Sequence, residues 1–324
     1  MNENSTASTL RRHEKYDRLI AAAKGKQAVA TAVAHPCDET SLRGAVEAGE
    51  AGLIKPILVG PKNKIAAVAK EFSLDLGGIE IVDVPHSQAA AAKAVELVRT
   101  GKADLLMKGS LHTDELLSEV MKRETGLRTG RRVSHVFVMD VPGHAQTLFI
   151  TDAAVNIAPD LVSKRDIIQN AIDLYAGLGL GTPKVAILSA VETVTPTIPS
   201  TIEAAALCKM ADRGQITGGE LDGPLAFDNA ISPEAARIKG IKSPVAGQAQ
   251  ILVVPDLEAG NMLAKQMAYL GKADSAGIVL GTRVPIILTS RADSAESRLA
   301  SCAVAVAFAY RLRESQKINL AVRG

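Results

Sequence analysis

A chain of 324 residues is too long for one compact core, so we expect two domains. The net charge of +2 is too small for a polyanion-binding surface, and 3% aromatic residues provide few stacking platforms for nucleic acid. No apolar run approaches the roughly 20 residues that cross a membrane. The three cysteines are widely spaced and odd in number, which is typical of a reducing compartment. We therefore expect a cytoplasmic protein whose partners include neither nucleic acid nor a membrane.

The first half of the chain alternates between short apolar runs and alanine-rich helical stretches. The predicted strands are 27–34, 56–60, 79–84 and 105–107, and the predicted helices are 42–49, 62–72 and 87–99. Two further strands, 133–139 and 147–151, lie close in sequence and are expected to form an antiparallel extension. Strands that alternate with helices of this length indicate βαβ units around a parallel sheet. The fold class is therefore α/β.

A glycine cluster, Gly177–Gly181, follows a predicted helix at 159–175 and is interpreted as the boundary between domains. Beyond it the predicted strands are 185–189, a strand near Leu221, 251–254 and 284–288, and the predicted helices are 200–211 and 257–270. A last helix, from Ser294, is expected to return to the first domain. The predicted domains are residues 1–177 with 294–324 and residues 178–293, with a ligand cleft between them.

The end of the apolar run 284–288 is the strongest candidate site. A strand that stops where a helix begins presents unpaired amides and the positive end of the helix dipole to an anion. Arg291 adds a planar fork that grips a phosphate, and Ser290 adds a hydroxyl. Asp293 and Glu296 lie within one turn, close enough to move a proton. The same two carboxylates also have the spacing of a helix capping box, and this alternative stays open.

Three other segments carry candidate binding residues. Lys108, Gly109 and Ser110 follow a predicted strand, where a lysine meets an anion and a glycine lets the backbone come close; a surface turn is the alternative. Arg128 and Thr129 belong to a loop with three arginines between Gly126 and Ser134, which would suit a ligand with several phosphates if it faced the same cleft as Arg291.

The third segment runs from residue 254 to residue 261. There Asp256 is a predicted helix N-cap, and Asn261 is a candidate hydrogen-bond donor to substrate. No phosphate loop, dinucleotide fingerprint or zinc motif occurs anywhere in the chain. The predicted chemistry therefore depends on side chains at the ends of strands.

Six segments together resemble the phosphate acetyltransferase/phosphate butyryltransferase family. They occur in family order and are residues 107–109, 127–136, 151–157, 222–230, 254–261 and 288–294. The resemblance implies a homodimer with a two-domain fold, a parallel/mixed sheet sandwich like that of the isocitrate and isopropylmalate dehydrogenases. It implies reversible transfer of a short acyl group, acetyl or butyryl, between coenzyme A and inorganic phosphate. Ser290 and Arg291 match the family's Ser-Arg pair in the cleft.

Two positions favour the butyryl-type branch of that family. Acetyl-type members carry an aspartate six residues after the arginine, where Ser297 stands, and an arginine where Ser118 stands. The general base is therefore open between Asp293 and Glu296, and the acyl chain length is open as well.

The predicted site has two groups of residues, and no metal or other cofactor is expected. The expected catalytic residues are Ser290, Arg291 and Asp293, and the expected substrate-binding residues are Lys108, Gly109, Ser110, Arg128, Thr129, Ser134 and Asn261. One alternative is a metal- and NAD(P)-dependent hydroxy-acid dehydrogenase on the same fold, with Asp222, Asp228 and Asp256 as metal ligands. The other is a coenzyme A-binding protein without turnover.

Overall fold

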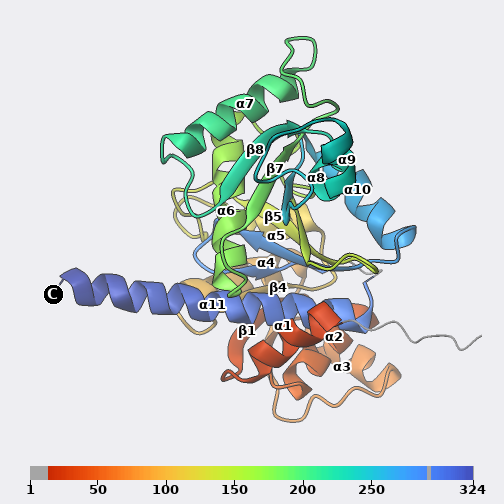
Figure 1. Cartoon of the computed structure of the whole chain (residues 1–324). Coiled ribbons are helices and arrows are strands. Elements are labelled where there is room, and N and C mark those ends of the chain that lie inside the picture. Colours follow the sequence, from red (N-terminus) through yellow and green to blue (C-terminus); the bar gives the residue numbers. More distant parts are fainter. Residues whose placement is uncertain (1–13, 290–292, 324) are drawn as a thin grey trace, which may run out of the picture.

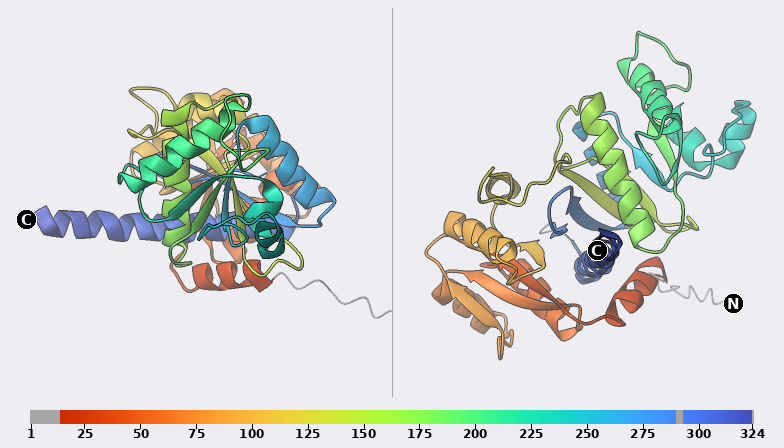
Figure 2. Two further views of the ribbon diagram at one scale, coloured as in Figure 1. Left: turned by 45° about the horizontal axis from the view of Figure 1, so that its top comes forward. Right: turned by 90° about the vertical axis from the view of Figure 1, so that its left-hand side faces the viewer.

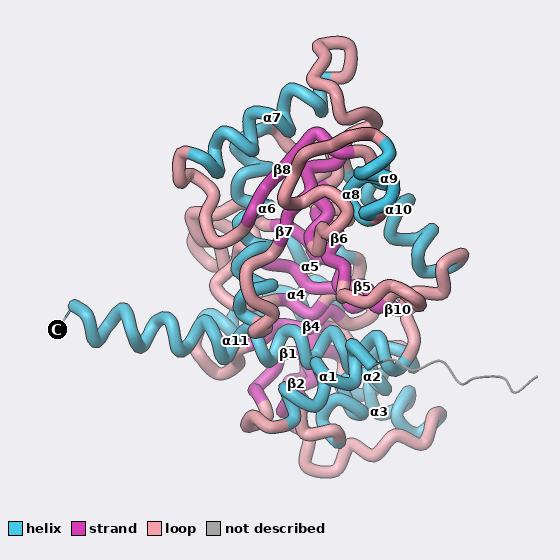
Figure 3. The backbone as a smooth tube through the Cα atoms, in the orientation of Figure 1, coloured by secondary structure: helices cyan, strands magenta, loops and turns pink. Residues whose placement is uncertain are grey.

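The computed structural model describes residues 14–289 and 293–323. Within these residues eleven strands form one mixed sheet (Figure 3), in the order β3-β2-β1-β4-β11-β10-β5-β6-β9-β7-β8. The strands are β1 (Val29–Ala34), β2 (Ile54–Gly60), β3 (Glu80–Asp83), β4 (Leu105–Lys108), β5 (Ser134–Asp140), β6 (Leu148–Thr151), β7 (Lys184–Leu188), β8 (Glu220–Leu225), β9 (Ile251–Val253), β10 (Asp274–Leu280) and β11 (Ile286–Ile287). The predicted α/β class and the antiparallel pairing of β5 with β6 are confirmed.

Helices cover the sheet along its length (Figure 1). They are α1 (Glu14–Lys24), α2 (Glu39–Glu50), α3 (Lys62–Glu71), α4 (Ser87–Arg99), α5 (Thr113–Val120), α6 (Leu161–Gly177), α7 (Pro199–Asp212), α8 (Phe227–Ile231), α9 (Pro233–Ile238), α10 (Leu257–Tyr269) and α11 (Ala295–Arg323). Helix α4 packs on β1, β2 and β4, whereas α6 packs on β5, β6 and β9. None of the helices in the described part of the chain combines the length and the apolar character needed to span a bilayer.

The strands run in two directions, which creates two chemically distinct ends of the sheet. Strand β10 is antiparallel to both β11 and β5, and β5 is antiparallel to β6, while the remaining pairs are parallel. Strands β1–β5 and β11 therefore finish at one end of the sheet, which we name the first end. Strands β6–β10 finish at the opposite end, the second end. Loops that follow parallel strands gather at each end, so either can carry a site.

The long helix α11 joins segments that are far apart in the sequence. It contacts α1, α2 and α6 as well as β4, β10 and β11, and the right-hand view of Figure 2 shows it end-on. Its residues 300–306 are buried on all sides, and most of them are alanine or valine, which lets neighbouring backbones come close. The aliphatic core that the composition indicated is thus organised around this helix.

The sheet continues past the predicted domain boundary at Gly177–Gly181. Strands β10 and β11, from the range predicted as the second domain, pair with β5 and β4 from the first. The division into two domains stays a prediction. Helix α1 and strand β10 were not predicted, because the first lies in a polar, charged stretch and the second opens with Asp, Ser, Ala and Gly.

Candidate functional site

The pairing of β4 with β11 brings two predicted site segments together at the first end of the sheet. The strands are parallel, with Met107 opposite Ile287, so Lys108 and Gly109 lie beside Leu288 and Thr289. Ser290 and Arg291 come next, and they lie outside the described residues. The predicted strand 284–288 is shorter in the structure, where only Ile286–Ile287 has ladder pairing. The Lys108 segment and the segment that leads to Ser290 nevertheless lie side by side at this end of the sheet.

Gly109 is required by the packing of this turn. A Cβ atom at Gly109 would lie 2.2 Å from the carbonyl oxygen of Ala34 and 2.5 Å from that of His35. The amides of Gly109 and Ser110 donate to those same carbonyls, each at 2.9 Å. The turn is therefore fastened to the end of β1, and any larger residue at this position would push the turn away from β1 and displace Lys108.

Ser110 is oriented by His35, which sequence reasoning missed. The Ser110 hydroxyl donates to the His35 carbonyl at 2.8 Å, so the His35 Nδ1–H donates to Ser110 Oγ at 2.9 Å. Burial, reinforced by Lys64, lowers the pKa of His35, which favours the neutral ring. A neutral imidazole and a hydroxyl thus border the site next to Lys108.

The start of α11 corrects the predicted helix cap. Ser294, and not an Asp293–Glu296 capping box, closes the first turn: its Oγ accepts from the Ser297 amide at 3.1 Å. Asp293 instead lines a cavity of about 260 Å³ together with Ser294, Ser297, Lys265 and Asp274. The carboxylate of Asp293 is therefore placed beside a space that could hold a substrate, at the first end of the sheet.

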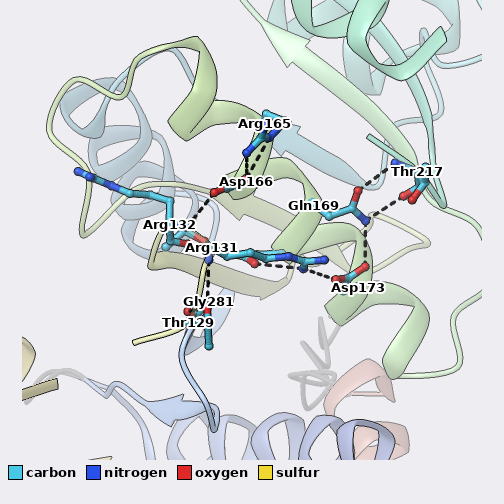
Figure 4. Close-up of polar contacts among 11 residues, drawn as sticks. Thr129, Arg131, Arg132, Arg165, Asp166, Gln169, Asp173, Thr217 and Gly281 are labelled. Carbon is cyan, nitrogen blue, oxygen red and sulfur yellow. Dashed lines mark hydrogen bonds and ion pairs between the residues drawn. The ribbon is translucent and has the colours of Figure 1, made fainter. Parts of the chain in front are cut away.

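The arginine loop lies elsewhere, and Figure 4 shows how it is held to α6. Arg131 forms an ion pair with Asp173, and the Arg132 amide donates to Asp166 at 2.9 Å. The Thr129 hydroxyl donates to the carbonyl of Gly281 at 2.6 Å. Much of this basic loop is thus held in place by contacts with α6 and with Gly281.

A buried polar network behind the loop was also missed from the sequence. The Asp152 carboxylate accepts hydrogen bonds from the amides of Ala154, Val155 and Asn156. The Asn156 side chain in turn accepts from Arg132 Nε at 2.6 Å and donates to the Val133 carbonyl at 2.8 Å. Asp152 belongs to a segment that resembles the family, at the end of a predicted strand, and that position was the available signal.

Two further predicted binding residues form hydrogen bonds within the protein. Ser134 is fully buried, and its Oγ accepts from Asn170 Nδ2 at 2.9 Å. Asn261 Nδ2 donates to the Ala153 carbonyl at 3.2 Å, next to the Asp152 network. The predicted N-cap role of Asp256 is confirmed, because its carboxylate accepts from the Ala259 amide at 2.8 Å.

The predicted residues therefore fall into two groups at opposite ends of β5. One group lies at the start of β5 and consists of Arg128, Thr129 and Ser134. The cavity that Asp293 lines is at the other end, because Asp274, which also lines it, pairs with Asp140, the last residue of β5. Six steps along a strand separate the groups by roughly 20 Å. Arg128 and Thr129 line a second cavity of about 250 Å³. The structure does not bring the arginine loop to the Asp293 cavity.

The cysteines are poor nucleophiles in this fold. Burial raises the pKa of Cys302 and of Cys208 to about 12, and that of Cys37 to about 11. Cys302 is fully buried, whereas Cys37 and Cys208 are only half-buried. None of the three carries a thiolate at neutral pH, so covalent catalysis by cysteine is disfavoured.

Comparison with known proteins adds independent findings. A family model described as "Phosphate acetyl/butaryl transferase" matches residues 86–306. A phosphate acetyltransferase of Rhizobium meliloti is 74% identical over 302 residues, which cover 93% of this chain and 96% of the relative. A phosphate butyryltransferase of Clostridium acetobutylicum is 43% identical over 292 residues, covering 90% and 97%.

A solved structure shows the same fold. The branched-chain phosphotransacylase from Enterococcus faecalis V583 superimposes with a TM-score of 0.77 at 33% identity, covering 87% of this chain and 99% of that one. The lean toward the butyryl-type branch is unconfirmed, since the relative at 74% identity is named for acetyl transfer.

Proposed function

Because this chain belongs to the phosphate acetyltransferase/phosphate butyryltransferase family, we propose that it transfers a short acyl group reversibly between coenzyme A and inorganic phosphate. The observation that carries this proposal is the family match over residues 86–306, together with relatives of up to 74% identity that are named for this reaction. The chain is then an acyltransferase, with acyl-coenzyme A and phosphate as its substrates on one side of the reaction.

The reaction centre proposed here lies at the first end of the sheet. Lys108 and the segment that leads to Ser290 and Arg291 meet there, and Asp293 lines the adjacent cavity. Lys108 and Arg291 together supply two positive charges for a phosphate, and the guanidinium of Arg291 can donate two hydrogen bonds to it. Ser290 and Arg291 enter on the family resemblance of their segment, since both lie outside the described residues.

In the direction that forms acyl-coenzyme A, Asp293 accepts the thiol proton and the thiolate attacks the acyl carbonyl. A C–S bond forms, the C–O bond to phosphate breaks, and the electron pair leaves with phosphate, which Arg291 and Lys108 stabilise. Ser290 donates a hydrogen bond to the developing oxyanion or to the phosphate. Both substrates are bound together, and positioning supplies much of the acceleration. The raised pKa values of the cysteines support a path without a cysteine acyl-enzyme.

The second group of residues is assigned to the nucleotide end of coenzyme A. Arg128 and Thr129 line the second cavity, and Arg132 is oriented there by Asn156. Coenzyme A is an extended molecule whose thiol is remote from its ribose phosphate, so one ligand can occupy two separated subsites. Ser134 and Asn261 then act indirectly, Ser134 through the Asn170 side chain and Asn261 through the Ala153 carbonyl.

A thiol-release assay tests the function. Acetyl-, propionyl- and butyryl-coenzyme A are each incubated with and without phosphate; we expect thiol release that depends on phosphate and is unaffected by a chelator, because no metal or other cofactor takes part. No thiol release, together with oxidation of a hydroxy acid by NAD(P) that a chelator abolishes, would favour the dehydrogenase alternative. Thermal stabilisation by coenzyme A without turnover would favour a binding protein. Within this assay, Arg291→Ala should lower turnover at least about a hundredfold with folding intact.

Three broader features complete the proposal. The protein acts in the cytoplasm, its fold is akin to that of the isocitrate and isopropylmalate dehydrogenases, and it forms a homodimer. The exposed side chains of Met262, Tyr269 and Leu270 on or next to α10 support the dimer. Glu258 and Lys265 flank Met262 on the same helix face, so the face is complementary to a second copy packed antiparallel.

A further inference from the structure

Arg298, in the first turn of α11, is a buried guanidinium. Only 8% of the residue is exposed. Its Nη1 donates to the carbonyl oxygen of Asp293 at 2.6 Å. Its Nε is buried and has no hydrogen-bond partner. No carboxylate of the described residues lies within ion-pair distance of it. Within the described residues, the positive charge of Arg298 therefore has no ion-pair partner beside the segment that enters α11.

The fold makes room for this side chain through a glycine on α2. A Cβ atom at Gly44 would lie 2.9 Å from Arg298 Cδ and 3.2 Å from Nε, and 3.8 Å from Met107 Cε. The arginine stem therefore lies against Gly44 of α2, close to where the side chain of Met107 also approaches this glycine. Its position is set by the same two elements, β4 and α11, that frame the proposed reaction centre.

A buried cation without an ion-pair partner costs free energy, because it loses hydration and gains no opposite charge in return. A simple anchor for the Asp293 carbonyl would not need a charge, since a neutral amide donates as well. A guanidinium at this place does more: it fixes the backbone at Asp293 and adds a positive charge that no carboxylate of the described residues pairs with.

We infer that Arg298 is a positioning residue for the phosphate subsite, which holds the backbone at Asp293 and whose unneutralised charge favours the bound phosphate. This inference rests on the proposed function. It adds to the proposed reaction centre a guanidinium that acts through the backbone at Asp293, without touching the substrate.

The test is steady-state kinetics with phosphate and acyl-coenzyme A varied separately. Arg298→Met should raise KM for phosphate at least about tenfold and lower kcat, with KM for acyl-coenzyme A within about twofold of wild type. Arg298→Lys keeps the positive charge on a shorter side chain, so its KM for phosphate should lie close to that of the wild type. An unchanged KM for phosphate in folded Arg298→Met would overturn the inference, and so would equal changes in both KM values.

Gly44→Ala offers a second, independent variant. It keeps Arg298 but pushes the guanidinium aside, so it should shift KM for phosphate in the same direction. Gly49→Ala is the matched control on the same helix: its new methyl would meet Pro56, remote from Arg298, and KM should stay at the wild-type value. If Gly44→Ala behaves like Gly49→Ala, Arg298 does not position the subsite.

The proposed function and this inference fail in different ways. Absence of phosphate-dependent thiol release in the wild-type protein refutes the function. The inference is then judged by thermal stabilisation with inorganic phosphate alone, which Arg298→Met should abolish relative to wild type. Stabilisation of equal size in both proteins, or none in wild type, refutes the inference.

Discussion

At the scale of single residues, the first end of the sheet depends on positions where only glycine fits. Gly109 lies against two carbonyl oxygens of β1, Gly44 against Arg298, and Gly277 within 2.4 Å of the Leu288 carbonyl once a Cβ is added. Each of these glycines lets a chain segment approach the site more closely than an alanine would allow. The reach of Lys108 and the path of the segment after β11 follow from these contacts.

Gly109→Ala should destabilise the protein, since the new methyl overlaps the Ala34 carbonyl. We expect a loss of roughly 3 kcal/mol in the free energy of unfolding, measured by urea denaturation. Gly130→Ala is a suitable control, because nothing lies within 4 Å of the added atom. Equal stabilities for the two variants would show that the turn after β4 relaxes freely.

His135 predicts an acid-sensitive fold. The ring is buried beside Phe137, and burial lowers the pKa of His135 from 6.5 to about 3. Below the unfolded pKa, the unfolded chain binds a proton at His135 that the folded chain does not bind. The stability that depends on neutral His135 is therefore complete above the unfolded pKa and is lost as pH falls below it. The free energy of unfolding should fall about 1.4 kcal/mol per pH unit more steeply in wild type than in His135→Gln.

The comparison is made by chemical denaturation between about pH 6 and about pH 4. His112→Gln serves as the control, because His112 is exposed and should leave the slope unchanged. Parallel profiles for wild type and His135→Gln would mean that His135 is protonated without cost.

At the scale of elements, the ends of helices and strands decide which groups are available for chemistry. Ser294 caps α11, and this releases Asp293 to line the cavity. Asp152 fastens the turn after β6, and through Asn156 it orients Arg132. The residue types at these junctions were visible in the sequence, but which carboxylate caps and which faces a cavity depends on backbone geometry within one turn.

Ser294→Ala should cost about 1 kcal/mol of stability, because the Ser297 amide loses its acceptor. Ser294→Asp should restore most of that loss, since an aspartate also caps and favours the helix dipole. Thermal denaturation of the three proteins measures the effect. If Ser294→Ala leaves the stability unchanged, Asp293 and not Ser294 caps the helix.

At the scale of the whole molecule, the continuous sheet separates two groups of candidate residues by the length of β5. The exposed α10 face lies next to the cavity that Asp293 lines, since Lys265 and Tyr269 line that cavity too. A second copy docked on α10 would therefore border the reaction centre, and assembly and activity would be coupled.

Met262→Lys should shift the protein from dimer to monomer, because it places a charge in the middle of the proposed contact. Light scattering after gel filtration measures the mass. Ile238→Lys changes an equally exposed apolar residue on α9 and should leave the mass unaltered. A monomeric wild-type protein, or a dimeric Met262→Lys, would remove α10 from the interface.

Local patterns in the sequence were sufficient for most elements, the fold class and the family resemblance. Alternating apolar runs, alanine-rich stretches and polar caps act within a few residues, and α4 runs from Ser87 to Arg99 as predicted. Tertiary structure alone decided the strand order, which puts Lys108 beside Leu288 and the arginine loop at the far end of β5. It also decided the burial of Arg298 against Gly44. These contacts join residues more than 150 positions apart, so their geometry depends on the packing of the whole sheet and not on local sequence.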